Sequence, residues 1–106
     1  MSNIISQLEE VQENLQERID TLAAKRNQHR DVLRELKREC AQATDMYRNA
    51  SDKAVAETYK NAMRDTNAAI SKVRAKIDGC WTAISEIMVA QTEIDIVIDA
   101  NKGEAA

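Results

Sequence analysis

The side chains best suited to nucleophilic or metal chemistry are sparse and scattered in this chain. Its 106 residues include one histidine, His29, and two cysteines, Cys40 and Cys80. Zinc sites use three or four protein ligands drawn mainly from Cys and His, so we expect no metal site. The sequence also lacks a Gly-rich phosphate loop, an HExxH motif and a CxxC motif. We therefore expect no catalytic site, no cofactor and no enzymatic activity.

Charged side chains are the second set that could do chemistry, and the two signs are segregated along the chain. Residues 1–24 and 77–106 sum to −4 and −5, whereas residues 25–39 and 60–76 sum to +3 and +4. The basic stretches contain a band that could contact phosphates: Arg30, Arg34, Lys37, Arg38, Lys72, Arg74 and Lys76. Acids are interleaved with this band, which is typical of a solvated helix face with pairs such as Asp31–Arg34. We therefore rank nucleic acid below protein as a partner.

A long apolar stripe predicts the first element that must position these charges. In the second half of the chain, its members recur at alternating gaps of three and four residues. They are Ala56, Tyr59, Met63, Thr66, Ile70, Val73, Ile77, Cys80, Ile84, Ile87, Gln91, Ile94 and Ile98. Heptad spacing of this kind keeps one face of a helix against a partner helix. The pattern predicts a long α-helix over about residues 53–101.

The first half of the chain carries a matching stripe. Its members are Ile4, Leu8, Val11, Leu15, Ile19, Leu22, Arg26, His29, Leu33, Leu36, Cys40, Ala43 and Tyr47. Two four-residue gaps adjoin between Val11 and Ile19, so we expect a stutter that relaxes the left-handed supercoil there. A second helix is predicted over about residues 3–48. The polar members His29, Thr66 and Gln91 are expected to form layers that fix the helix register.

Residues 49–52 are the best candidate for a turn between the two predicted helices. Ser51 or Asp52 can cap the second helix, because both side chains can bond to the backbone amides that follow. Near the far end Gly103 resembles a helix stop, so we expect a frayed tail over residues 102–106. The chain has no proline, and its length suits a single domain over residues 1–106.

A turn at residues 49–52 folds the two halves into an antiparallel two-helix coiled-coil hairpin. Opposed stripe residues then have numbers that sum to 102 or 103, as in Leu15–Ile87 and Ile19–Ile84. The thirteen positions of one stripe meet the thirteen of the other without remainder. We therefore predict an all-α fold made of one helical hairpin.

The end that holds both termini is too apolar to be covered by two helices alone. Between residues 80 and 98, apolar side chains flank the stripe on both sides. A helix that is apolar over so much of its circumference needs more than one neighbour. We therefore expect two copies to associate there as a homodimeric four-helix bundle. The predicted interface residues are Trp81, Ile84, Ile87, Met88, Ile94, Val97, Ile98, Ile4, Ile5 and Leu8.

Helical contact is the activity that these patterns favour. We expect a protein–protein interaction module (a scaffold, adaptor or small chaperone in a bacterial or phage setting) whose partners are itself, as a dimer or tetramer, and another protein. One alternative is an acidic helical inhibitor of a nucleic-acid-handling protein, since both acidic stretches meet at one end. Another is weak nucleic-acid binding by the basic band. With no long uncharged apolar run and no signal-peptide pattern, we expect no membrane contact and a cytoplasmic location.

Overall fold

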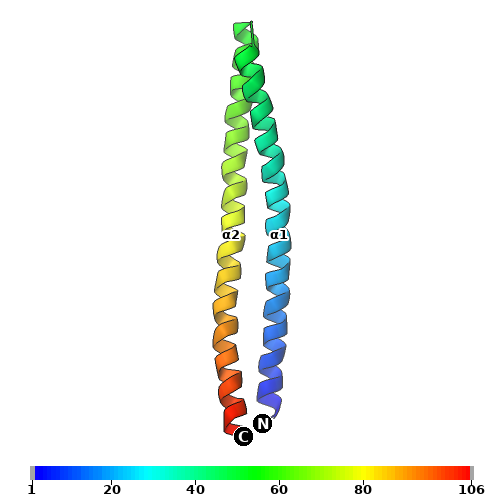
Figure 1. Cartoon of the computed structure of the whole chain (residues 1–106), viewed down its shortest axis with the longest axis vertical. Helices are drawn as coiled ribbons and strands as arrows, with labels where there is room; N and C mark the ends of the chain where they lie inside the picture. Colours follow the sequence, from blue (N-terminus) through cyan, green and yellow to red (C-terminus); the bar gives the residue numbers. More distant parts are fainter. Residues whose placement is uncertain (1, 106) are drawn as a thin grey trace. The chain divides into compact units, whose positions relative to one another are not determined.

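The computed structural model describes the backbone of residues 2–105 and the side chains of residues 3–103. Two helices, α1 (Ser2–Asn49) and α2 (Lys53–Ala105), account for nearly all of these residues, and no strand occurs among them (Figure 1). The predicted all-α class with two long helices is confirmed. Good helix formers such as Ala, Glu, Lys, Leu and Gln dominate both segments, and no proline removes a backbone donor.

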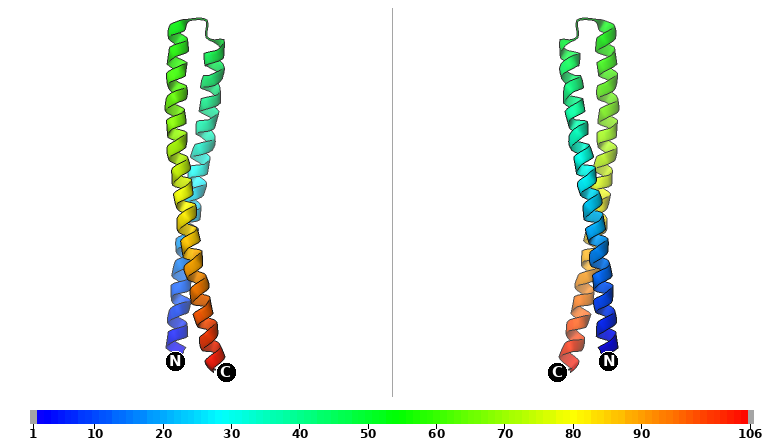
Figure 2. Two further views of the ribbon diagram at one scale, coloured as in Figure 1. Left: turned by 90° about the vertical axis from the view of Figure 1, so that its left-hand side faces the viewer. Right: turned by 90° about the vertical axis from the view of Figure 1, so that its right-hand side faces the viewer.

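The chain forms two compact units, and both helices contribute to each of them. Unit 1 combines the start of α1, up to Lys25, with the end of α2, from Gly79 onward. Unit 2 is the segment Arg26–Asp78. In Figures 1 and 2, unit 1 contains the blue part of α1 and the yellow-to-red part of α2, which lie side by side. Unit 2 contains the turn.

Unit 2 is a helical hairpin closed by a short turn at residues 50–52. The Ala50 amide donates to the Tyr47 carbonyl at 3.3 Å. Asp52 then caps α2, because its Oδ1 accepts a hydrogen bond from the Ala54 amide at 2.8 Å. The predicted turn is confirmed to within one residue, and Asp52 supplies the cap. The buried residues of this unit are Ala43, Ile70 and Val73.

Unit 1 is an antiparallel pair of helical segments with a thin core. Ile19, Ile84 and Ile87 form this core, and Leu15, Leu22 and Ala23 pack against it. Ile84 is the most buried residue, with an exposed fraction of 2%. The contact of Ile19 with Ile84 agrees with the predicted register, in which their numbers sum to 103.

The α1 stripe in unit 1 uses different residues from those expected. Ile4 and Val11 are 54% and 42% exposed, whereas their neighbours Ile5 and Gln12 are half-buried. Up to Ile19, the half-buried and buried positions are Ile5, Leu8, Gln12, Leu15 and Ile19, which alternate gaps of three and four. The predicted stutter is therefore wrong. An unbroken heptad keeps one face of α1 against α2, and it leaves Ile4 and Val11 partly in solvent.

The end of α2 also differs from the prediction. The helix continues through Gly103 to Ala105, so the frayed tail expected over residues 102–105 is wrong, and Ala106 lies outside the described residues. Neither glycine of the chain has a positive φ, which a glycine helix stop requires. Lys102 Nζ lies 3.7 Å from Glu9 Oε1, and this ion pair links the last turns of α2 to α1.

Candidate functional site

The structure divides the ten predicted interface residues into two groups. Six lie in the pairing between α1 and α2 of unit 1: Ile84, Ile87 and Ile98 are buried, and Ile5, Leu8 and Ile94 are half-buried. The other four are exposed: Ile4, Trp81, Met88 and Val97. Only the exposed group offers its side chains to a partner in this conformation.

Exposed apolar side chains of α2 form a strip that begins beside its buried isoleucines and extends to the outer side of the helix. We call the set Trp81, Met88, Val89 and Ile96 the outer stripe. Their exposed fractions are 55%, 50%, 60% and 63%. Trp81 and Met88 are seven residues apart, as are Val89 and Ile96, and Met88 and Val89 are adjacent, so the four form two neighbouring rows on one side of the helix. Large apolar side chains grouped in this way mark contact surfaces more often than scattered ones do.

Two hydroxyl side chains lie among the members of the outer stripe, and both are satisfied within α2. Ser85 Oγ donates to the Trp81 carbonyl at 2.9 Å, and Thr92 Oγ1 donates to the Met88 carbonyl at 3.0 Å. Hydroxyls that bond to the carbonyl four residues back have less need of water. The outer stripe is therefore less polar than its sequence alone indicates.

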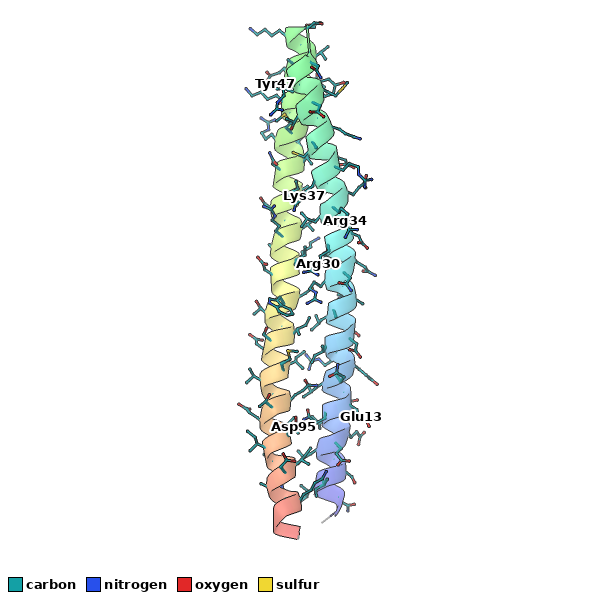
Figure 3. The ribbon with its side chains drawn as sticks, viewed as in Figure 1. Glu13, Arg30, Arg34, Lys37, Tyr47 and Asp95 are labelled. Atoms are coloured by element: carbon teal, nitrogen blue, oxygen red, sulfur yellow. The ribbon has the colours of Figure 1, made fainter. Side chains whose placement is uncertain are left out.

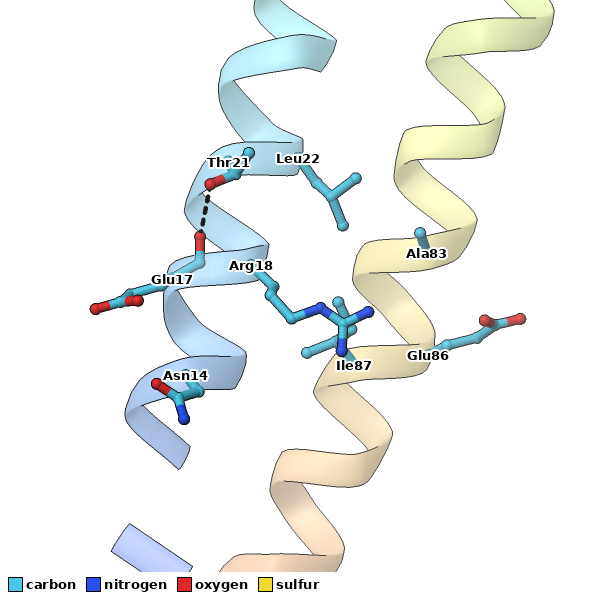
Figure 4. A pocket seen from close by; sticks show the side chains of 8 residues that line it. All are labelled: Asn14, Glu17, Arg18, Thr21, Leu22, Ala83, Glu86 and Ile87. Atoms are coloured by element: carbon cyan, nitrogen blue, oxygen red, sulfur yellow. Dashed lines mark hydrogen bonds between the residues drawn. The ribbon is translucent and has the colours of Figure 1, made fainter. Parts of the chain in front are cut away.

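Unit 1 also contains a groove between its two helices (Figure 4). It has a volume of about 590 Å³ and is lined by Asn14, Glu17, Arg18, Thr21, Leu22, Ala83, Glu86 and Ile87. Leu22, Ala83 and Ile87 supply its apolar floor. The Arg18 side chain extends from α1 toward α2, while the Thr21 hydroxyl donates to the Glu17 carbonyl at 3.0 Å. This groove was not predicted from the sequence.

A polar cluster joins the helices of unit 1, and the sequence predicted only part of it. Gln12 Nε2 donates to the Gln91 carbonyl at 2.8 Å and to Asp95 Oδ1 at 2.6 Å. Gln91 Nε2 in turn donates to Gln16 Oε1 at 3.2 Å. Gln91 was expected as a polar layer, but the apolar pattern had favoured Val11 over Gln12. Thr66, also expected to fix register, donates to the Ala62 carbonyl of its own helix at 2.7 Å.

The basic band lies entirely in unit 2, and all seven of its residues are exposed. Figure 3 labels three of them, Arg30, Arg34 and Lys37, on α1. Arg34 Nη1 lies 3.5 Å from Asp31 Oδ1, which confirms the predicted pair, and Arg38 Nη1 lies 3.1 Å from Glu35 Oε2. Acids of the same helix therefore engage two of the seven cations. Such exposed pairs add little stability.

The two units have opposite formal charges. Unit 1 carries ten acidic and three basic residues, for a formal charge of −7, and unit 2 carries eight acidic and twelve basic residues, for +4. Their sum is the −3 of the whole chain. Surfaces of opposite charge attract different classes of ligand.

No protein-family model, curated protein or solved structure matches this chain. Within the described residues, no three His, Cys, Asp or Glu side chains gather closely enough to hold a metal ion, and Cys40 and Cys80 are free thiols. Neither helix, over the part that the structure describes, has a stretch both long and apolar enough to cross a membrane.

Proposed function

We propose that this chain is a non-enzymatic protein–protein interaction module, a scaffold, adaptor or small chaperone, that self-associates through the outer stripe of α2. The observation that carries the proposal is the exposure of four large apolar side chains on one face of one helix. Complete burial of one such side chain is worth about 1.5–3 kcal/mol. A partner that covers the stripe therefore gains several such contributions against the entropic cost of association.

A second copy is the simplest partner for the outer stripe. In a dimer with two-fold symmetry the same stripe serves both sides, so one apolar face is enough. Two copies of unit 1 would then form a four-helix bundle with Trp81 and Met88 in its centre. Asp95 and Asp99 lie close to the stripe in sequence, and their carboxylates repel those of the second copy in such a dimer. We therefore expect a dimer that becomes tighter as salt screens the carboxylates.

The test is the solution mass of the chain and of two matched double variants, measured by light scattering over a range of concentrations. Met88→Glu with Ile96→Glu places charges on the outer stripe and should give a monomer. Val32→Glu with Met46→Glu changes side chains that are 48% and 50% exposed in unit 2, and it should leave the dimer intact. Equal masses for the two double variants, or a wild-type monomer at every concentration, would contradict the proposal.

A second candidate function has support in the −7 charge of unit 1. Spaced carboxylates on helices can occupy the phosphate-binding surface of a nucleic-acid-handling protein. Five of these acids are suited to neutralisation: Glu9, Glu13, Glu86, Glu93 and Asp95. If the chain is such an inhibitor, changing them to Gln or Asn abolishes binding to the target, whereas the Met88→Glu and Ile96→Glu changes leave it intact.

A further inference from the structure

An apolar strip continues along unit 1 from the residues that line the groove. Residues seven apart on a coiled-coil helix lie on the same side of the seam, so heptad rows extend the groove. The rows are Ile4, Val11 and Arg18 on α1, and Ala83, Ala90 and Val97 on α2. Three of these residues are strongly exposed: Ile4 at 54%, Val11 at 42% and Val97 at 46%. Five of the six are apolar.

The small residues of this floor leave room for side chains of a third helix. Ala83 and Ala90 are half-buried and lie two turns apart on α2. Knobs-into-holes packing needs such gaps, because each incoming side chain inserts among four residues of the facing helices. A third helix in the groove would also cover Ile4 and Val11, which the heptad phase of α1 leaves outside the pairing with α2. The groove therefore has the apolar floor that a helix-binding site needs.

Carboxylates border this groove on both helices. Glu17 and Glu86 line it, and their side chains point away from the seam on opposite sides (Figure 4). Glu10 lies seven residues before Glu17, and Glu93 lies seven residues after Glu86, so each has the same heptad position as its counterpart. None of these four glutamates forms an ion pair with another described residue. The groove thus combines an apolar floor with borders whose carboxylates form no ion pair among the described residues.

We propose that this groove binds a basic amphipathic α-helix of another protein and so completes a three-helix bundle in unit 1. The apolar stripe of that helix covers Val11, Ala83 and Ala90, and its Lys or Arg residues on either flank meet Glu17 and Glu86. Charge complementarity selects this partner. Nucleic acid and anionic lipid are repelled by the same carboxylates, and unit 1 of a second copy has the same −7 charge. The groove and the outer stripe occupy different sides of α2, so this binding is separate from self-association.

Arg18 gives the proposal a sharp test, because it is the single cation that lines the groove. It forms no ion pair with any described residue. Its charge opposes a basic ligand and favours an acidic one. Reversing it with Arg18→Glu should therefore tighten binding of a basic helix and weaken binding of an acidic helix.

The experiment uses two fluorescein-labelled peptides and measures fluorescence anisotropy with the full-length protein. Each peptide has about 18 residues, with Leu at helical spacing and either Lys or Glu at all other positions. We expect the Lys peptide to bind at least about tenfold more tightly than the Glu peptide, with an affinity that falls as salt rises. Arg18→Glu should raise the affinity for the Lys peptide severalfold, and Glu86→Lys should lower it by about tenfold.

Two matched controls locate the binding site. Glu13→Lys makes the same charge change as Glu86→Lys on an exposed residue outside the groove, and should have the smaller effect. Ala83→Trp fills the floor and should abolish binding, whereas Ala24→Trp, at an exposed position on α1, should not. Circular dichroism confirms that each variant is folded.

Four results would overturn the proposal. Equal affinity for the two peptides would show that the carboxylates do not select the partner. Binding that survives Ala83→Trp would place the peptide elsewhere on the protein. A dimer that Ala83→Trp dissociates would make the groove a contact between copies of this chain. If the dimer persists and neither peptide binds, the groove proposal fails while the proposed self-association through the outer stripe stands.

Discussion

Gln12 reaches from α1 to α2 and donates from Nε2 to the Gln91 carbonyl at 2.8 Å, although the two residues are 79 positions apart in sequence. The same nitrogen lies 2.6 Å from Asp95 Oδ1. The amide oxygen of Gln12, by contrast, is buried and accepts no hydrogen bond from a described residue. This side chain therefore fixes the pairing of unit 1 through its nitrogen and leaves an unsatisfied polar atom at its oxygen. Polar layers of this kind trade stability for a single register.

Replacing Gln12 with leucine tests whether this polar layer lowers stability. Gln12→Leu removes the unsatisfied oxygen and adds an apolar side chain to the seam, so the free energy of unfolding should rise by about 1 kcal/mol. Urea denaturation followed by circular dichroism measures the change. Gln12→Ala is the control, because it removes the hydrogen bonds without restoring apolar contact, and it should lower stability. A Gln12→Leu protein less stable than the wild type would mean that the cross-helix hydrogen bonds outweigh the cost of the buried oxygen.

The stripe of α2 could be predicted from the sequence, and that of α1 could not be predicted in full. Each of the thirteen predicted positions on α2 is buried or half-buried. On α1, the pattern preferred Val11 to Gln12 because only apolarity was counted. Val11 and Gln12 are adjacent, and only one of them can face α2. The constant heptad phase places Gln12 there despite its polarity, and its amide forms hydrogen bonds with the other helix. Hydrogen bonds between distant residues leave no periodic trace in a sequence.

The candidate site was predictable only as a region. Periodicity identified the apolar surplus of residues 80–98, but it could not say which face of α2 the partner helix of the same chain would cover. Ile84 and Ile87 are buried in that pairing, whereas Trp81 and Met88 are left exposed. The groove could not be predicted from the sequence, for a different reason. It depends on the small size of Ala83 and on the path of the Arg18 side chain, and neither produces a motif.

Ile84 and Met88 lie one turn apart on α2 and should respond very differently to truncation. Ile84 is 2% exposed in the core of unit 1, so Ile84→Ala should cost about 2–5 kcal/mol through lost burial and a cavity. Met88 is 50% exposed, so Met88→Ala should cost less than about 1 kcal/mol in the monomer. Urea denaturation at low protein concentration separates the two. Similar losses would show that Met88 belongs to the folded core and not to a partner surface.

Gly79 offers a stabilising substitution. It lies in the interior of α2 without a positive φ, and a Cβ added to it would meet no atom within 4 Å. Because glycine in a helix interior costs about 1 kcal/mol relative to alanine, Gly79→Ala should raise the melting temperature by about 4–8 °C. Gly103→Ala, in the last turns of α2, should give a smaller gain. A Gly79→Ala protein with reduced oligomer mass would instead mean that another chain approaches the helix backbone here.

The Asp52 cap should stabilise the first turn of α2. Its carboxylate accepts the 2.8 Å hydrogen bond from the Ala54 amide, one of the donors that the first turn of a helix cannot satisfy internally. Asp52→Ala should therefore lower the free energy of unfolding by about 1 kcal/mol, whereas Asp52→Asn, which keeps an acceptor oxygen, should lose much less. Ser51→Ala is the neighbouring control and should be nearly neutral. Thermal melts followed at 222 nm measure all three variants, and a loss for Ser51→Ala as large as that for Asp52→Ala would contradict the assignment of Asp52 as the cap.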